Sequence, residues 1–595
     1  MIRRPRPAAL AMAAAGSLAV ALCGCGAAAP ATEVSLGSGT VSVFPIPGSR
    51  VASPEAQVAF RGLPVSQISH VTVTGSSTGG HRGRLLSDSD QGGGSFIPIR
   101  PFAPGEHVTV TAQLRGRAGK AISFAFQVAH PVGEVPNAKL HFMSRRPGDV
   151  VSFHSRPDLD PPAVTMDRPG AGSAGDRIFL GPEEGPVQSG AMILDPDGKL
   201  VWFHQVPRGQ VVTDVRVQRY LGRPVLTFFE GYIGSGAGNG EDHILDTSYR
   251  QVALVRAANG LRADMHEFDL LPGGRALITA YFPVRWADSP RPGAKRDVVL
   301  DGVVQEIDIR TGLLLFQWDS LDHVPLSASY VGPDKHKPYD YFHINSVQAD
   351  PDGNLIISSR NTWTAYKVAA RDGGIIWRLG GKHSTFRLPR DGTFSFQHDV
   401  RVRAPEDRVV TLFDNGAGPP DVQSQSRGLT LRLNMQTRSA TVAGVLRHSP
   451  PLLAHFEGNV QELPGGAEFL GWGQRPYFTE FSGGRAVLDG HFVGGNPSYR
   501  AYLERWSATP ATAPALAASV NGRRTTVYAS WNGATDVARW RVLGGSQPGA
   551  VRALAGAPWA GFETAITVPS ERYVTVQALD AAGRVIGHSR PIRVG

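Results

Sequence analysis

A short turn motif recurs along the middle of this 595-residue chain. Pro-Asp-Gly or Pro-Gly-Gly precedes a hydrophobic segment at four places, which begin at Pro196, Pro272, Pro351 and Pro464. Proline presets the first turn position and glycine supplies the positive φ of a tight turn. A second hairpin signal alternates with the first, in which Gly leads into an aliphatic–aromatic segment such as 313–318. Two alternating hairpins make one four-stranded unit, which is one blade of a β-propeller.

The spacing of these units predicts how many there are. His266, His343 and His398 stand just before the first strand of a unit, and Glu457-Gly458 takes that place in the next. His398 follows His343 by 55 residues, whereas His343 follows His266 by 77 because of a long loop at 283–300. At about 55 residues per blade, residues 176–508 hold six blades, with seven as the alternative.

The composition favours an all-β chain. Its 70 Gly and 45 Pro make up about a fifth of the residues, above the usual share of about 12%. Long helix-forming stretches are missing from the sequence, which excludes an all-α bundle. Beyond the N-terminus no apolar run reaches 18 residues, which excludes a polytopic membrane protein.

Strand-rich segments flank the propeller region on both sides. Residues 34–130 alternate in short strands and predict an N-terminal β-sandwich. Residues 131–175 are rich in proline and are interpreted as a linker. Residues 512–595, with Trp531 and Trp540 in alternating strands, predict a C-terminal β-sandwich of the fibronectin-III or immunoglobulin type, without a catalytic role.

The first 25 residues have the three parts of a bacterial export signal. Arg3, Arg4 and Arg6 precede a small apolar stretch, and Leu22-Cys-Gly-Cys25 follows it. This run resembles a lipobox and predicts lipid on Cys25, with residues 26–33 as a tether. The chain is therefore expected to be an exported lipoprotein at the outer face of the bacterial cell membrane. Cleavage without lipid is the alternative. Both cysteines lie here, so the exported body is expected to have no disulfide.

The net charge of +9 does not indicate a nucleic-acid partner. Part of it belongs to the three N-terminal arginines, and basic and acidic residues are interspersed elsewhere. No lysine or arginine run is interleaved with aromatic residues. We interpret the charge as that of an ordinary soluble surface.

The three recurring histidines are the candidate site. The innermost strands of a propeller run in one direction along the central channel, so residues at their starts meet at one mouth. Asn345 lies two residues after His343 and would share its strand face. Arg360 ends the returning strand, and its guanidinium would suit a sulfate, phosphate or carboxylate.

Three interpretations of this group remain open from the residues alone. The side chains could satisfy backbone groups where blades join. Three histidines could also bind zinc, although a fixed arginine beside a dication requires an anion between them. The third interpretation is an anion site for group transfer, in which one histidine is the nucleophile.

The motifs around these residues resemble those of the bacterial arylsulfotransferases, enzymes that transfer a sulfuryl group from an aryl sulfate to a phenol without a nucleotide donor. The resemblance covers most of residues 176–508. The motifs that carry it are His343-Ile-Asn-Ser346, Ser358-Ser-Arg360, Gly374-Ile-Ile-Trp377, Gln397-His-Asp399 and Gly471-Trp-Gly473.

The resemblance implies a six-bladed propeller preceded by a β-sandwich. It also implies that His398 takes the sulfuryl group covalently and that His343, Asn345, Arg360 and His266 surround the transferred group. The expected reaction is ping-pong transfer between small-molecule aryl sulfates and phenols, with no cofactor and no metal. A non-catalytic surface propeller that binds an anionic or phenolic ligand, or a wall component, is the alternative function. The oligomeric state stays open, a homodimer included.

Overall fold

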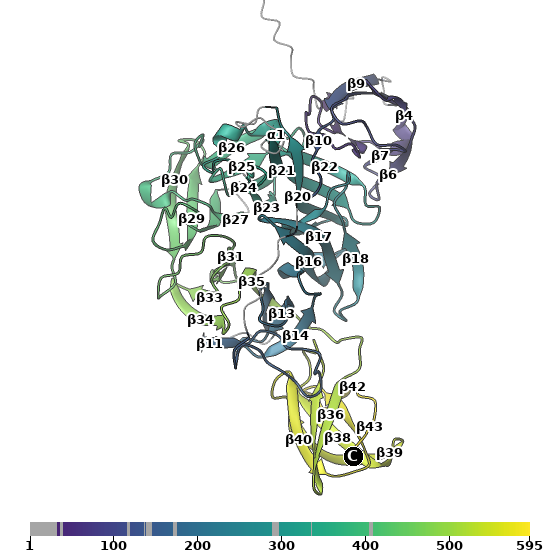
Figure 1. The fold of residues 1–595 in the computed structure, drawn as a ribbon, viewed down its shortest axis with the longest axis vertical. Helices are drawn as coiled ribbons and strands as arrows, with labels where there is room; N and C mark the ends of the chain where they lie inside the picture. The colour runs from purple at the N-terminus through teal and green to yellow at the C-terminus, as the bar shows by residue number, and fades with distance from the viewer. Residues whose placement is uncertain are drawn as a thin grey trace, which may run out of the picture.

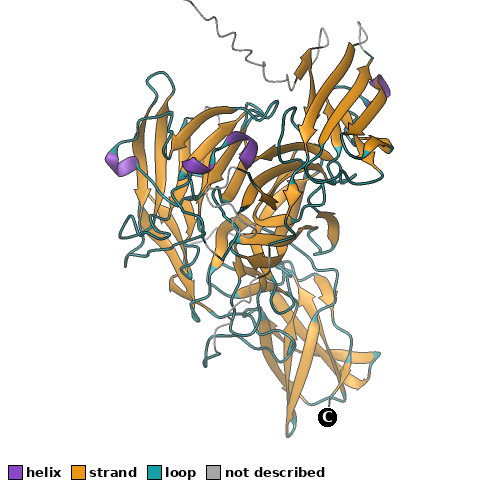
Figure 2. Ribbon diagram, turned by 45° about the horizontal axis from the view of Figure 1, so that its top comes forward, coloured by secondary structure: helices purple, strands orange, loops and turns teal. Residues whose placement is uncertain are grey.

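The computed structural model describes residues 33–35, 40–115, 120–135, 137, 145–170, 175–287, 297–334, 336–403 and 408–594. The predicted export signal with Cys25, and all but the last residue of the predicted tether, lie outside the described residues. The chain is 54% strand and 2% helix, which confirms the prediction of an all-β protein (Figure 2). No helix among the described residues is long and apolar enough to cross a membrane.

The central region is built from four-stranded antiparallel units placed around a common centre (Figure 1). The first unit contains β12 (Asp176–Pro182), β13 (Gly190–Leu194), β14 (Leu200–Gln205) and β35 (Ser498–Arg505). The second contains β15 (Val211–Tyr220), β16 (Arg223–Gly234), β17 (Ala237–Leu245) and β18 (Gln251–Val255). The third contains β19 (Ala263–Leu271), β20 (Arg275–Arg285), β21 (Val298–Asp308) and β22 (Leu314–Asp319). The last two sets are joined through a pairing of Gly240 with Ala263.

The series continues with three more sheets. The first of these contains β23 (Ile344–Ala349), β24 (Leu355–Ser359), β25 (Thr364–Val368) and β26 (Ile375–Gly380). The second contains β27 (His398–Arg403), β28 (Val409–Asp414), β29 (Arg427–Asn434) and β30 (Ser439–Leu446). The third contains β31 (Asn459–Glu462), β32 (Glu468–Gly471), β33 (Tyr477–Ser482) and β34 (Arg485–Phe492), with β11 (Val164–Arg168) at its edge.

The innermost strands of these units contact one another in a closed order. β15 contacts β19, β19 contacts β23, β23 contacts β27, and β27 contacts β31. β35 then contacts both β31 and β15, so the order returns to its start. The beginnings of β19, β23 and β27 carry the predicted site residues, and the contacts bring these strands side by side.

Hydrophobic cores lie between adjacent sheets, which explains why many strands are apolar on both faces. Every residue of β22 and of β25 is buried. One core joins Ile356 and Trp377 of one sheet to Val400, Leu412 and Leu429 of the next. A sheet packed on both sides cannot show the alternating polar face of an exposed strand.

The recurring turns take two places in the units rather than one. The turns at Pro272, Pro351 and Pro464 join the first and second strands of their units. The turn at Pro196 joins β13 to β14, the third and fourth strands. This departure arises because β35, from the far end of the region, supplies the innermost strand of that sheet.

Each flanking region contains two sheets around a shared core. At the N-terminal side one sheet holds β1 (Glu33–Ser35), β2 (Thr40–Phe44), β3 (Val58–Arg61), β7 (Gly93–Pro98) and β6 (Gly83–Ser87), and the other holds β5 (Gly79–His81), β4 (Ile68–Gly75), β8 (His107–Leu114) and β9 (Lys120–Gln127). At the C-terminal side they hold β36 (Ala515–Asn521), β37 (Arg524–Ser530) and β40 (Glu563–Pro569), and β39 (Ala550–Pro558), β38 (Arg539–Gln547), β41 (Tyr573–Leu579), β42 (Val585–His588) and β43 (Ile592–Arg593).

The segment interpreted as a linker is partly built into the central region. β10 (His130–Pro131) pairs with β20, and β11 pairs with β34. The remaining regular elements are single turns: α1 (Ser320–His323) and the 3₁₀ turns Val65–Gln67, Leu326–Ala328 and Arg390–Gly392.

Candidate functional site

His266 and His343 meet at the centre of the ring of innermost strands. Their ring centroids are 5.1 Å apart and their planes stand at 83°. His266 lies within β19 and His343 directly before β23, where its φ of 51° puts the backbone in the left-handed region. A bulky residue rarely adopts this conformation, so the neighbouring structure must hold it there.

Each of these two histidines has a carboxylate on its Nδ1. Asp264 Oδ2 lies 2.6 Å from His266 Nδ1, and Asp340 contacts His343 Nδ1 in the same way. Burial alone would raise the pKa of Asp264, but His266 and further hydrogen bonds hold it below its usual range. The ionised carboxylate keeps the proton on Nδ1, which leaves Nε2 as the proton acceptor.

His398 is held in a different way, by an amide. It is 1% exposed, and its Nδ1 lies 2.7 Å from Asn415 Oδ1. Asn415 Nδ2 donates to the carbonyl oxygens of Ala454 and Glu457, so Oδ1 is the acceptor and Nδ1 of His398 carries the proton. The lone pair is therefore on Nε2, which accepts a 3.2 Å hydrogen bond from the backbone N–H of Glu457.

The charges around His398 keep its imidazole neutral. Burial, and then the charge of Arg360, hold the pKa of His398 well below its usual value, and His343 and His266 act in the same direction. These three residues therefore lie within electrostatic reach of His398. A neutral imidazole that carries its lone pair on Nε2 has the form of a nucleophile.

Arg360 follows β24 and lies over the ring of Phe396, 4.8 Å from its centroid. Its Nη1 donates to Asn361 Oδ1 and its Nη2 to the carbonyl of His455, both at 2.9 Å. Nε is buried and has no hydrogen-bond partner among the described residues. Burial lowers the pKa of Arg360 to about 10 against the opposing charge of Asp340, so the guanidinium stays protonated at neutral pH.

Asn345 links the strand of His343 to the strand of His398. It is fully buried on β23, and its Nδ2 donates to the carbonyl of Gln397 at 2.7 Å. Its Oδ1 is buried without a partner among the described residues. A register irregularity between Ile344 and Ser346 interrupts the simple alternation from which a shared face with His343 was predicted.

Residues 216–492 match the family described as Arylsulfotransferase (ASST). This region is similar to the arylsulfotransferase family. The match spans a little under half of the chain and confirms the resemblance seen in the sequence motifs. It includes all five predicted site residues.

No curated protein matches the chain. Among solved structures, a protein of unknown function from Bacteroides caccae is 12% identical, with a TM-score of 0.36 over 56% of this chain and 99% of that one. A catalytically inactive form of virginiamycin B lyase from Staphylococcus aureus, with quinupristin, is 8% identical, with a TM-score of 0.26 over 62% and 97% of the two chains. A Lactobacillus plantarum protein is 12% identical, with a TM-score of 0.29 over 70% and 96%.

Several residues that shape the candidate site were not predicted. Asp264 and Asp340 stand two and three residues before their histidines, and this local spacing was a usable signal. Asn415 comes 17 residues after His398 on the returning hairpin, where no motif marks it. Glu457 was recognised as the residue that replaces histidine in the repeat, but its N–H contact with His398 was not.

Glu457 and Glu183 are buried carboxyl groups on the His398 side of the centre. Each has an oxygen without a partner among the described residues. Burial, and then Glu183, raise the pKa of Glu457 well above its usual value. Burial, and then Glu184, raise the pKa of Glu183 to about 8. With a pKa of about 8, Glu183 holds a proton at neutral pH.

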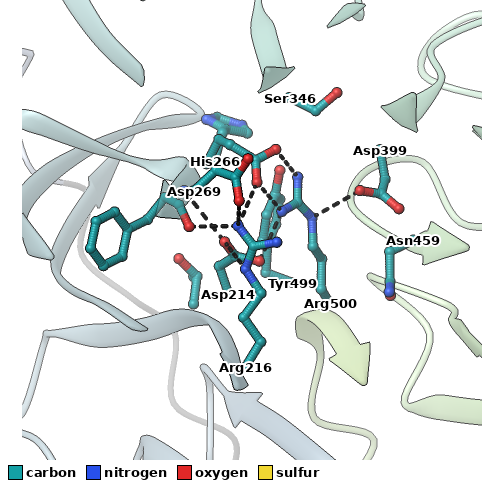
Figure 3. A network of polar contacts seen from close by, with 12 residues as sticks. Asp214, Arg216, His266, Asp269, Ser346, Asp399, Asn459, Tyr499 and Arg500 are labelled. Atoms are coloured by element: carbon teal, nitrogen blue, oxygen red, sulfur yellow. Dashed lines mark hydrogen bonds and ion pairs between the residues drawn. The ribbon is translucent and has the colours of Figure 1, made fainter. Parts of the chain in front are cut away.

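A buried ionic network lies beside His266 (Figure 3). Arg500 of β35 is fully buried and bonds Asp214 of β15 at 2.8 Å and Glu267 of β19 at 3.2 Å. Arg401 of β27 bonds the other oxygen of Glu267 at 2.7 Å. Such charges are stable in a protein interior only when closely paired, so the network fixes the relative positions of these strands.

The network also reaches the candidate site directly. The hydroxyl of Tyr499 donates to the carbonyl of Asn345 at 2.9 Å, and Arg500 Nη2 contacts the same oxygen at 3.2 Å. The ring of Tyr499 lies 5.5 Å from that of His266. Among the described residues, no group of three or more His, Cys, Asp and Glu side chains has the arrangement of a metal site.

Proposed function

We propose that this protein is an exported aryl sulfotransferase that transfers a sulfuryl group from an aryl sulfate to a phenol through a sulfo-histidine on His398. The observation that carries the proposal is the state of His398: a buried neutral imidazole, fixed through Nδ1 by Asn415, with the Arg360 cation in electrostatic reach. The family match supports sulfotransferase activity in general terms.

In the first half-reaction, the Nε2 lone pair of His398 attacks sulfur in line with the aryl oxygen. The N–S bond forms, the S–O bond breaks, and its electron pair leaves on the phenoxide. The Glu457 N–H must release that lone pair for the attack, because the same electrons cannot do both. The proton stays on Nδ1 of the sulfo-imidazole and is donated in a hydrogen bond to Asn415 Oδ1. The negative equatorial oxygens of the sulfuryl group are stabilised by Arg360.

In the second half-reaction, a phenol attacks the same sulfur and regenerates neutral His398. The acceptor proton passes to Nε2 of His343 or His266, whose Nδ1 carboxylates stabilise the imidazolium that forms. In the first half-reaction of the next cycle, the same histidine gives this proton to the departing phenoxide. Burial lowers the pKa of His343 below its usual value, which suits a base more than an acid at neutral pH.

The proposal extends to the architecture and the location. The closed order of innermost strands supports a six-bladed propeller over residues 176–508, and the paired sheets support a sandwich at each end. We place the protein at the outer face of the bacterial membrane through lipid on Cys25. Substitution of Cys25 by Ala should release the protein from the membrane fraction, and retention there would contradict the anchor.

The test uses a chromogenic aryl sulfate with and without phenol. Wild-type protein should release the chromophore in a phenol-dependent manner, whereas His398→Ala should lose at least about a thousandfold of this rate. The exposed His588→Ala is the matched control and should keep the wild-type rate. Without phenol, the intact mass of the wild type should increase by one SO₃ group on His398.

The hydrogen bond from Glu457 to His398 Nε2 favours a second candidate function, a propeller that binds phenolic or anionic ligands without turnover. Saturable binding of the donor with no release across a panel of donors and phenols would support this second function and contradict transfer. Equal rates in wild type and His398→Ala would contradict only the role given to His398, and not the transfer activity.

A further inference from the structure

A cavity of about 760 Å³ lies outside the ring of histidines, among loops of the β23–β26 and β27–β30 sheets. Its wall includes Tyr330, Trp363 and Phe394, and its rim includes Arg390 and Arg447. This size is ample for a small organic molecule, and an aromatic wall with a few polar groups is typical of a ligand pocket. None of these residues takes part in the proposed reaction.

The aromatic wall is rigid and flat. Tyr330 and Trp363 stack face to face, with centroids 3.8 Å apart and planes within 5°. Trp363 has a φ of 52°, a strained backbone for so large a residue. Strain of this kind persists only where surrounding contacts impose it and is frequent at ligand sites.

Two polar groups of the cavity lining have no hydrogen-bond partner among the described residues. Ser395 is 1% exposed and its Oγ is unpaired, and Nε1 of Trp363 is buried and unpaired. An unsatisfied buried donor is energetically unfavourable, so a ligand acceptor at this wall would be favoured.

The rim supplies positive charge. Arg390 and Arg447 are exposed, and neither forms an ion pair among the described residues. The charge of Arg427, which also lines the cavity, is balanced by Asp414 at 2.9 Å. Asp391 is the acidic residue of the lining, so the two free arginines leave the rim net positive.

A single ring separates the cavity from the catalytic centre. The Trp363 edge packs on Phe396 with centroids 5.0 Å apart, and the Arg360 guanidinium lies on Phe396 at 4.8 Å. The carbonyl of Phe396 also accepts from His398 Nδ1 at 3.1 Å. The cavity is thus a neighbour of the histidine site and separate from it.

We propose that this cavity is a binding site for a planar aromatic anion, distinct from the site of sulfuryl transfer. The ring of the ligand packs against the Tyr330–Trp363 wall, an acceptor atom meets Ser395 Oγ or Trp363 Nε1, and the anionic group meets Arg390 and Arg447. Occupancy does not depend on turnover.

The test is isothermal titration of the full chain with 1-naphthalenesulfonate. Its sulfur is bonded to carbon, so it cannot donate a sulfuryl group, and binding is measured whether or not the protein is an enzyme. Trp363→Leu should weaken binding about tenfold through lost stacking. Arg447→Ala should weaken it about fivefold, with reduced salt dependence. The neutral analogue 1-naphthylmethanol should bind more weakly than the sulfonate.

Two control variants test whether the sulfonate binds in this cavity. Arg432→Ala removes an exposed arginine of the same sheet that is not part of the cavity, and should bind like wild type. His398→Ala should also bind like wild type. Loss of binding in His398→Ala with normal binding in Trp363→Leu and Arg447→Ala would overturn the proposal, as would no binding to wild type. Arg447 is exposed, so its variant tests the site even if Trp363→Leu does not fold.

Discussion

The two sides of the candidate site hold their histidines with different groups. On the β19 and β23 side, a carboxylate meets Nδ1 of His266 and of His343. On the β27 side, an amide meets Nδ1 of His398. A carboxylate stabilises an imidazolium, whereas an amide fixes the tautomer without adding charge. In the proposed mechanism, this difference separates a nucleophile that stays neutral from bases that accept a proton.

The acids near each side follow the same division. Asp264, beside His266, has a lowered pKa and is ionised. Burial raises the pKa values of Glu183 and Glu457, on the His398 side, and Glu183, whose pKa is about 8, is protonated at neutral pH. In the proposed mechanism, the protonation of Glu183 lowers the negative charge near the atom that attacks an anionic donor.

Removal of the cation on the His398 side should have the largest effect. In Arg360→Gln the equatorial oxygens lose their cation and the pKa of His398 rises, so kcat/KM should fall about a hundredfold or more. Arg360→Lys keeps the charge without the planar fork and should be affected less. Steady-state kinetics with a chromogenic aryl sulfate measure both. Equal losses in the two variants would show that charge on Arg360 is not what matters.

Replacing the amide of Asn415 by a carboxylate tests the difference between the two sides of the site directly. Asn415→Asp should raise the pKa of His398 and protonate Nε2, so the rate at pH 7 should fall about tenfold and recover towards pH 9. The pH–rate profile is the measurement.

Asn415→Ala is the control, because it removes the anchor without adding charge. Its loss of rate should be similar at all pH values. An Asn415→Asp profile parallel to that of Asn415→Ala would show that the charge difference between the two sides has no catalytic role.

The sequence indicated the repeat and which histidines it brings together, because turn residues and strand starts are local signals. The sequence did not predict Asn415, because no motif marks its position after the returning strand. It did not predict the Arg500–Glu267 pair, because its two residues come from strands far apart in the chain. The turn at Pro196 was assigned to the wrong hairpin, since the strand that shifts its position, β35, begins about 300 residues later. Asn345 lies on the strand that follows His343, but the bulge that commits its amide to Gln397 has no local signature.

The carboxylate on His343 should matter in proportion to the basicity of the leaving phenoxide. Asp340→Asn removes the charge that stabilises the imidazolium of His343, so proton transfer becomes harder. Transfer from 4-nitrophenyl sulfate should change about twofold and transfer from unsubstituted phenyl sulfate about tenfold, since only the latter leaving group needs the proton. A panel of donors with graded leaving-group pKa values measures the slope. An unchanged slope would assign the proton transfer to His266 or another group.

The smallest expected effect is that of protonated Glu183 on the stability of the folded protein. The pKa of Glu183 is raised to about 8 in the folded protein from 4.5, so the folded state holds a proton that the unfolded state has lost between these pH values. Its contribution to stability is therefore present at low pH and decreases as pH rises through this window. Glu183→Gln keeps a neutral side chain, so its apparent melting temperature should fall less than that of wild type between pH 5 and pH 8. The exposed Glu55→Gln is the matched control and should follow wild type. If Glu183→Gln also follows wild type, Glu183 is ionised in the folded protein, and the division of charge between the two sides does not extend beyond the histidines.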